Sequence, residues 1–412
     1  MNEPSKKMKL YVLGGFAVLC LFILLGWFAF HEEPPPPNQH RAKAEPAKPQ
    51  ARQVAPAFKP VDDVSNETPT NQPDASASTN AAVIYRQAFD LFNALSKEQK
   101  LIVSDWRTNV DASVEAELCV KTAPICDLMR QASAVTNCDW GIDPITFDTK
   151  LPHLAASRSL ARAAIWNAAH CRSNDVAGAT DDAVSALQLG QRVSRSLLIG
   201  NFVDIAVQNI ASSYVAQNLG LFRGVDGQRL TAAFEDPSYE ETPSRVMEKE
   251  ADMVERRAAH LASLPTDQAE KEVSELAGSF DGIPFVRDRA VALAALKQIA
   301  DSERELAKAL ASSSEDKYQA WQQHSAELQA ATPLASLFLP VYDLFVERTR
   351  CAEVNRAMVV AGLAVAENRM EALEAHPDPA SGKPFQYTKT DDGFELQSTL
   401  EVNGTPYKIR FK

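Results

Sequence analysis

Four residues in one short segment have side chains that could bind a cation or transfer a proton. Asp139, Asp143 and Asp148 precede His153. Carboxylates beside a histidine can hold a hard cation or act as a general acid and base. Their spacing matches no defined ligand motif, and Asp143 before Pro144 is typical of a turn. We therefore expect turn-forming and solvated carboxylates here, and keep a cation or acid–base site as the alternative.

Signatures of common enzyme classes are absent from the sequence. It contains no HExxH, GxSxG, GxGxxG or P-loop motif, so the usual metalloprotease, hydrolase and nucleotide-binding patterns are missing. We expect Trp140 to fill a space between helices, and His170 beside Cys171 to lie at a helix end. The sequence predicts no metal and no cofactor. An enzyme whose site is assembled from distant residues remains the alternative.

Five cysteines that follow the first 30 residues are candidates for disulfides. None belongs to a CxxC pair, so a zinc knuckle or a thioredoxin-type site is not expected. On one continuous helix Cys119 and Cys126 would lie about 10 Å apart, which is too far to bond. We expect any bridge to join different elements, with buried free thiols as the alternative. The five are Cys119, Cys126, Cys138, Cys171 and Cys351.

An uncharged apolar segment runs from Leu10 to Phe30. A helix of this length would span roughly 30 Å, the thickness of a bilayer's hydrocarbon core. Lysines among residues 1–9 precede the segment, which by the positive-inside rule keeps that end in the cytoplasm and exports the rest. Bulky residues at the end of the segment disfavour cleavage by a signal peptidase. The sequence predicts an uncleaved transmembrane signal anchor at 10–30, in contact with the lipid bilayer.

Residues 31–80 are predicted to form a disordered linker. Ten prolines fall in this stretch, which therefore cannot bury enough apolar surface to offset the entropy of ordering. Proline density favours an extended spacer, and a ligand for a proline-recognising module is the alternative. The net charge of the chain is −12 and no basic cluster occurs, which argues against nucleic acid as a partner.

From residue 81 onward, apolar residues recur at intervals of three and four, which is typical of amphipathic helices packed on one another. Ser96 is a good N-cap, Thr242-Pro243 opens another helix, and Pro124 is expected to interrupt or restart one. We predict a helical domain at 81–376, with a break between two lobes near 224–242. The expected helices cover 81–95, 96–106, 112–135, 151–172, 177–198, 202–221, 242–261, 293–310, 318–328 and 341–373.

The periodicity changes near the end of the sequence to one that is typical of β-strands. Asp391-Asp392-Gly393 and Asn403-Gly404 are turn signals between aromatic and β-branched residues. Residues 377–412 are expected to form a small antiparallel β unit packed on the last helix, because an isolated hairpin is marginally stable in water. The predicted fold class is mainly α, with a transmembrane helix, a Pro-rich linker, a multi-helix exported domain and this C-terminal β unit.

Several short motifs resemble those of a known group. They are DPASGKPFQY at 378–387, DGFEL at 392–396, YRQAF at 85–89, CDWG at 138–141 and LPHL at 151–154. With the anchor, they resemble a group of uncharacterised bacterial single-pass membrane proteins, and the ending is also similar to the C-terminal region of type II secretion pseudopilins. The resemblance implies a mostly helical domain, exported from the bacterial inner membrane and closed by a β unit. It implies no activity.

Two classes of function follow from these features. The first is a membrane-anchored extracytoplasmic interaction or scaffold module without catalytic activity, whose partner is an unidentified envelope protein. The second is an envelope hydrolase or other enzyme with its site near Asp139 and His153. A cleft lined by converging polar groups would favour the enzyme, and a broad exposed apolar groove would favour the interaction module. The sequence predicts no oligomeric state.

Overall fold

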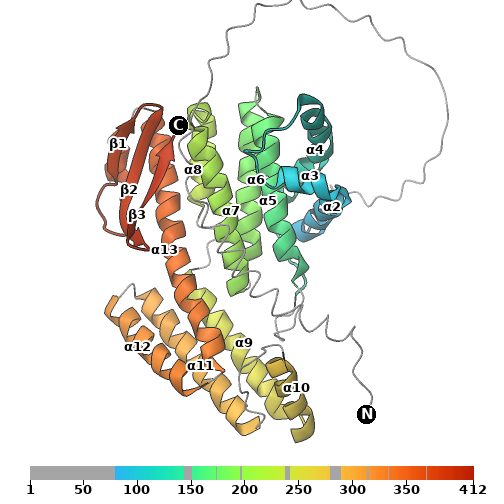
Figure 1. Cartoon of the computed structure of the whole chain (residues 1–412), viewed down its shortest axis with the longest axis vertical. Coiled ribbons are helices and arrows are strands. Elements are labelled where there is room, and N and C mark those ends of the chain that lie inside the picture. The colour runs from blue at the N-terminus through green and yellow to red at the C-terminus, as the bar shows by residue number, and fades with distance from the viewer. Residues whose placement is uncertain are drawn as a thin grey trace, which may run out of the picture.

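The computed structural model describes residues 79–142, 151–172, 174–194, 197–236, 242–278, 289–312, 315–332, 334–367 and 369–412. The predicted anchor and almost all of the predicted linker lie outside these ranges. Within them the chain is mainly helical and ends in a three-stranded antiparallel sheet, which confirms the predicted fold class at that level (Figure 1). No helix of the described ranges is both long enough and apolar enough to cross a bilayer.

Helices make up most of the described chain, and α5, α6 and α7 lie side by side in its centre (Figure 1). The helices are α2 (Ala81–Ala94), α3 (Lys97–Val103), α4 (Ala112–Ala134), α5 (Pro152–His170), α6 (Val176–Ser194), α7 (Leu198–Gln217), α8 (Val225–Phe234), α9 (Pro243–Ser263), α10 (Thr266–Gly278), α11 (Arg289–Ala311), α12 (Glu315–Ala331), α13 (Ala335–Ala366) and α14 (Ala372–Ala375), with a 3-10 turn at Leu219–Leu221. The strands are β1 (Gln386–Thr390), β2 (Gly393–Val402) and β3 (Thr405–Phe411).

Local sequence signals set the starts of two helices as predicted. Ser96 and Gln99 form a reciprocal capping box at the start of α3. Thr242 accepts a hydrogen bond from the Arg245 N–H at 3.3 Å, and Pro243 occupies the first position of α9. Both caps satisfy N–H groups that a helix would otherwise leave unpaired.

Helix α4 continues through Pro124, so the predicted interruption is wrong. The proline removes the N–H that would bond to the Val120 carbonyl. Val120 is 76% exposed, so this carbonyl lies on the face of the helix where water can reach it. Leu118 and Ile125 are buried on either side of the proline and hold both halves of the helix on one core. Packing therefore outweighs the local cost of the proline.

Two separate hydrophobic cores divide the described chain into what we call the first lobe and the second lobe. The first core contains residues of α2, α4–α8, the C-terminal part of α13 and the sheet. The second contains residues of α9, α11, α12 and the N-terminal part of α13. Helix α13 therefore belongs to both lobes, and Figure 1 shows it running from the sheet into the lower bundle. Leu198, at the start of α7, also packs in the second core.

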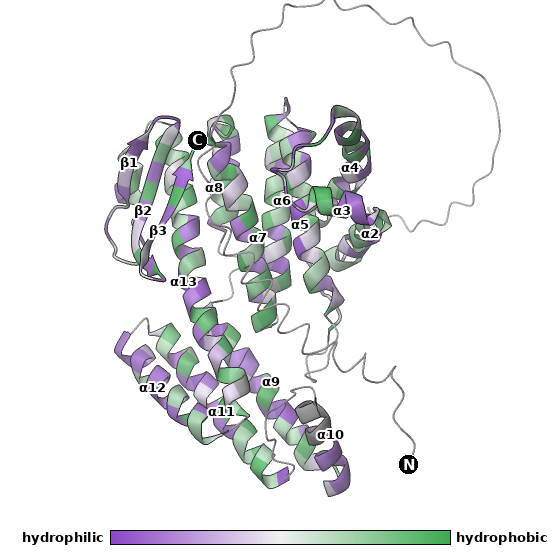
Figure 2. Ribbon diagram, in the orientation of Figure 1, coloured by the Kyte–Doolittle hydropathy of each residue, from purple (hydrophilic) through white to green (hydrophobic). Residues whose placement is uncertain are grey.

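The second lobe is a bundle of amphipathic helices. Hydrophilic and hydrophobic residues alternate around α9, α11 and α12 (Figure 2). Inside the bundle, the Trp321 indole N–H donates to the Ser302 carbonyl at 2.9 Å. On the outside, Arg304 of α11 pairs with Asp252 of α9 at 3.0 Å and with Glu255. Apolar contacts inside and ion pairs at the surface together join α11 to α9.

The sheet is a meander with the order β1-β2-β3, in which both pairs of neighbours are antiparallel. Asn403 and Gly404 connect β2 to β3 with φ of 53° and 73°, values that a two-residue turn of this hand requires. Gly393 begins β2, where a Cβ atom would collide with the Phe411 backbone. The two predicted turn signals therefore lie at the two ends of β2.

One face of the sheet packs on the first lobe. Phe394 and Phe411 stack with ring centroids 4.9 Å apart, and a Cβ atom on Gly362 of α13 would collide with the Phe411 ring. The Lys412 N–H donates to the Ala216 carbonyl of α7 at 2.9 Å. The sheet thus completes the first core against α13 and α7.

Asp378, the first residue of the DPASGKPFQY motif, ties the preceding loop to the sheet. It is 1% exposed, and its carboxylate accepts hydrogen bonds from Ser398 Oγ at 2.8 Å, the Thr399 N–H at 2.9 Å and the Ala380 N–H at 3.0 Å. Burial opposes ionisation, but the bonds from Thr399 and Ala380 hold the pKa of this carboxyl below its usual value. The motif therefore positions the sheet.

Candidate functional site

Asp139 shapes a turn in the structure. Its Oδ1 accepts a hydrogen bond from the Gly141 N–H at 2.9 Å, and Gly141 has a positive φ of 64°. Its backbone exchanges two hydrogen bonds with the Asn80 side chain, at 2.8 Å and 2.9 Å. These bonds fasten the segment to the start of α2. Asp143 and Asp148, the other two carboxylates of this candidate site, lie outside the described residues.

His153 and Trp140 form an aromatic stack beside this turn. Their ring centroids are 4.7 Å apart, and Trp140 also stacks on Tyr85 and Phe89 of α2. The Trp140 indole N–H donates to the Arg192 carbonyl at 3.3 Å. The tryptophan therefore fills the space between α2, α5 and α6.

Burial also sets the protonation of His153. The side chain is 8% exposed, and burial, with a smaller contribution from the charge of Arg86, lowers its pKa to about 4. The imidazole is therefore neutral at pH 7. Among the described residues, no group of histidines, cysteines and carboxylates could hold a metal ion.

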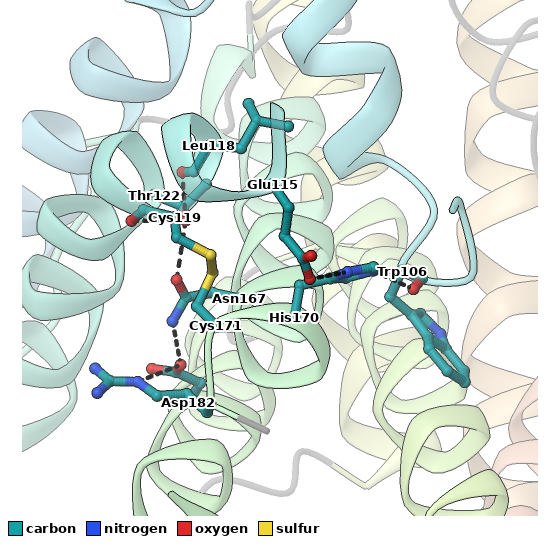
Figure 3. The surroundings of a disulfide bond; sticks show 10 residues. Trp106, Glu115, Leu118, Cys119, Thr122, Asn167, His170, Cys171 and Asp182 are labelled. Atoms are coloured by element: carbon teal, nitrogen blue, oxygen red, sulfur yellow. Dashed lines mark hydrogen bonds and ion pairs between the residues drawn. A yellow bond between two sulfur atoms is a disulfide. The ribbon is translucent and has the colours of Figure 1, made fainter. Parts of the chain in front are cut away.

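The structure places a disulfide between Cys119 in α4 and Cys171 at the end of α5 (Figure 3). Their Cα atoms are 5.5 Å apart, and 52 residues separate them in the sequence. Cys126 and Cys351 are buried, and burial raises the pKa of Cys351 to about 11 and that of Cys126 well above its usual value. Cys138 is partly buried. The bridge joins two different elements of the first lobe.

A chain of buried polar groups runs beneath the disulfide (Figure 3). Thr122 Oγ1 donates to Asn167 Oδ1 at 2.9 Å, and Asn167 Nδ2 donates to Asp182 Oδ2 at 2.6 Å. The Asp182 side chain is fully buried, and Arg130 of α4 pairs with it. Burial raises the pKa of Asp182 to about 6, against the opposing effects of Asn167 and Arg130. The chain joins α4, α5 and α6.

His170 anchors the connection between α3 and α4. Its Nδ1 lies 2.9 Å from a Glu115 carboxylate oxygen and its Nε2 lies 2.9 Å from the Trp106 carbonyl oxygen (Figure 3). Both ring nitrogens face acceptors, so only an imidazolium donates to both. The residue after His170 is Cys171, so the disulfide and the histidine fix the same helix end. This arrangement positions the Trp106 backbone against α5.

A pocket of about 90 Å³ opens between the α3–α4 connection, α5 and α7. Three arginines, Arg107, Arg158 and Arg162, supply most of the charge of its described lining, in which Asp105 is the one carboxylate. The remaining lining residues are small, apolar or neutral polar: Ser104, Trp106, Ala206, Asn209, Ile210 and Ser213. We call this the arginine pocket.

Two of the three arginines have no ion-pair partner among the residues that the structure describes. Arg158 and Arg162 lie four residues apart on α5, a spacing at which like charges repel. Burial and then the charge of Arg162 lower the pKa of Arg158. Within the described part of the chain, neither guanidinium forms an ion pair or a hydrogen bond. Both side chains are half-buried, so the pocket holds two incompletely solvated cations.

The third arginine is held in place by its neighbours. The Arg107 N–H donates to Asp105 Oδ1 at 3.0 Å, and its guanidinium donates to Ser213 Oγ of α7 at 2.6 Å. The guanidinium also lies over the Trp106 ring, 5.0 Å from the centroid. Arginines donate hydrogen bonds and remain protonated at all ordinary pH values. The arginine pocket is therefore suited to binding an anion.

Our reading of the sequence did not single out the arginine pocket. One signal was present: α5 has two arginines four residues apart and no acidic residue anywhere along its length. A helix that is otherwise rich in buried alanine does not need such a pair for packing. No local sequence pattern indicates that Arg107 and Ser213 line the same pocket, because they belong to elements that are far apart in the sequence.

Comparison of the chain with protein-family models, with curated proteins and with solved structures finds no significant match.

Proposed function

We propose that this chain is a bacterial inner-membrane protein with one anchor at 10–30 and an extracytoplasmic helical domain that acts as a binding or interaction module. The observation that carries this proposal is a disulfide in the domain that follows an uncharged apolar segment. Disulfides persist in oxidising compartments outside the cytoplasm. The lysines before the apolar segment give the same orientation by an independent rule.

The distribution of polar groups supports binding over catalysis. The arginine pocket presents donors to its interior. The region of the alternative enzyme site has a buried neutral imidazole and a turn-forming aspartate. A general acid or base must reach the substrate, whereas His153 is buried against the Trp140 ring. No observation favours the hydrolase alternative.

Thiol labelling of the full chain in its native membranes tests the proposal. A maleimide polymer that adds a fixed mass per free thiol is applied to denatured samples with and without prior reduction. We expect reduction to expose two further thiols, which a Cys119→Ser, Cys171→Ser variant would lack. Deletion of residues 10–30 keeps the protein in the cytoplasm, and the extra thiols should then react without reduction.

A topology reporter fused after Lys412 provides the second measurement. A phosphatase reporter that requires export should be active in the intact fusion and inactive when residues 10–30 are deleted. Activity without the apolar segment, or a cytoplasmic reporter in the intact fusion, would overturn the proposed orientation. In that case the cysteines of the native chain should also label without reduction.

A further inference from the structure

The arginine pocket has the charge of a site for one particular class of anion. Three arginines and one aspartate give it a net charge of +2. A phosphate monoester carries about −1.5 to −2 charges at pH 7, whereas a carboxylate carries one. We propose that the arginine pocket binds a doubly charged tetrahedral oxyanion, either free phosphate or the phosphoryl end of a larger ligand. This proposal does not depend on where the domain is located.

The arrangement of donors fits that chemistry. A guanidinium presents its N–H groups in a planar fork that matches the oxygen atoms of phosphate. Arg158 and Arg162 approach from α5, and Arg107 from the α3–α4 connection. Ser213 and Asn209 of α7 add neutral polar groups on the third side. The anion would therefore be held from three elements of the first lobe.

The walls of the pocket are fixed before any ligand arrives. His170 bonds to the Trp106 carbonyl next to Arg107, and the disulfide holds the end of α5 on α4. Arg107 is itself positioned by Ser213 and by the Trp106 ring. Preorganised donors lose little conformational entropy when they bind, which raises affinity.

Size restricts what can be enclosed. A volume of about 90 Å³ is well below the roughly 300 Å³ of a pocket that surrounds a drug-sized ligand. Only a small anion or an end group enters. The acidic charge of the chain as a whole, −12, opposes approach by long polyanions such as nucleic acid. A compact dianion is the ligand class that satisfies both conditions.

Arg158 and Arg162 are like charges four residues apart on one helix, and their repulsion lowers the stability of the domain. Residues that bind ligands commonly lower the stability of the free protein. An anion that bridges both guanidinium groups would remove this cost. Substitution of either arginine should therefore have two separate effects. It should weaken anion binding, and it should leave the melting temperature without the anion unchanged or raise it.

Calorimetric titration of the full chain in a non-ionic detergent, in chloride buffer of constant ionic strength, tests the proposal. We expect inorganic phosphate and sulfate to bind at one site and acetate to bind far more weakly. Arg158→Gln and Arg162→Gln should each raise the dissociation constant for phosphate about 10- to 100-fold, the usual effect of losing hydrogen bonds to a charged group. Arg256→Gln, an exposed arginine of the second lobe, is the control with the same charge change.

Thermal unfolding without phosphate distinguishes a binding role from a structural one. Arg158→Gln and Arg162→Gln should melt at or above the temperature of the parent protein. A glycerol phosphate titration identifies the source: tighter binding than inorganic phosphate would indicate the end of a larger ligand, and equal or weaker binding would indicate the free ion. Equal binding of phosphate and acetate, or unchanged phosphate binding in both variants, would overturn the proposal.

Discussion

The two lobes bury charge in opposite ways. In the first lobe, the buried Asp182 is met by Arg130 and Asn167, and Arg172 lies 3.8 Å from it. In the second lobe, Glu250 is 7% exposed and Glu303 is fully buried. No arginine, lysine or histidine of the described residues forms an ion pair with either of these two glutamates.

The hydrogen-bond donors to Glu250 and Glu303, the two buried glutamates of the second lobe, are neutral groups. Glu250 accepts from the Leu198 N–H at 2.6 Å, and Glu303 accepts from the Tyr342 hydroxyl. Burial raises the pKa of Glu250 to about 7 and that of Glu303 well above its usual value. Partners thus keep the carboxylate of the first lobe charged at neutral pH, whereas burial favours the protonated forms of the two carboxyls of the second lobe. The same residue class can therefore stabilise one core as an anion and occupy another as an acid.

Breaking the disulfide should have the largest effect, and it should act on the first lobe. A loop of 52 residues closed by a bridge implies about 4 kcal/mol of stabilisation in the chain-entropy treatment. We expect a Cys119→Ser, Cys171→Ser variant to lose this much free energy of unfolding in urea. Cys351→Ser is the matched control, because it removes a thiol that forms no bridge.

Fluorescence separates the lobes in that measurement. Trp321 is in the second core, whereas Trp140 and Trp166 are in the first. A Trp321→Phe version reports the first lobe with little signal from the second. If the parent protein had the same free energy of unfolding with and without a reducing agent, the bridge would not form.

Asp182→Ala should have the next largest effect. It leaves Arg130, Arg172 and Asn167 without their shared acceptor. Breaking a buried pair by removal of one partner costs about 3–5 kcal/mol, and partial exposure of Arg130 places the expected loss near the lower end. Urea unfolding measures the change. Asp181→Ala, next in sequence but half exposed, should cost less than about 1 kcal/mol. Similar losses of unfolding free energy in both variants would contradict the conclusion that charged partners stabilise the buried carboxylate of the first lobe.

Glu250→Gln should have a smaller effect of the opposite sign. The folded-state pKa of Glu250, about 7, lies above its ordinary value of 4.5. The folded protein therefore holds this proton more tightly, and the stabilisation is present below pH 4.5 and lost as pH rises through 7. The amide keeps the acceptor for Leu198 and cannot ionise. We expect nearly equal stability at pH 4.5 and a gain of about 3 kcal/mol at pH 8.5.

The control for this variant lies on the same helix. Glu248 is exposed on α9, and Glu248→Gln should leave the pH dependence of unfolding unchanged. If Glu250→Gln were destabilising at pH 8.5, an ionised Glu250 would be favourable in the second core, and the contrast with Asp182 would disappear.

Periodicity and caps predicted most of the helices because these signals are local. Ser96 with Gln99 and Thr242-Pro243 begin helices where the sequence indicates. Asn403-Gly404 forms the expected turn. The same local reasoning failed at Pro124, where burial on both sides of the proline outweighed its helix-breaking effect.

The sites depended on contacts that no local pattern encodes. Asp139 and His153 are close in sequence, yet in the structure Asp139 bonds to the Gly141 N–H while His153 stacks on Trp140. The arginine pocket joins Arg107 to Ser213, and their side chains meet only after three helices have packed. The pair Arg158 and Arg162 was the one local clue, because α5 offers no acidic residue to balance it.

Helix α13 has a consequence for the order in which the molecule is made. The first core needs the C-terminal part of α13 and the sheet, and these follow the residues of the second core along the chain. A chain synthesised from its N-terminus can therefore finish the second bundle before the first, although segments of the first emerge earlier. Cys119 and Cys171 both precede the second lobe. Their bridge can therefore close early and hold α4 on α5 until the C-terminal part of α13 and the sheet complete the first core.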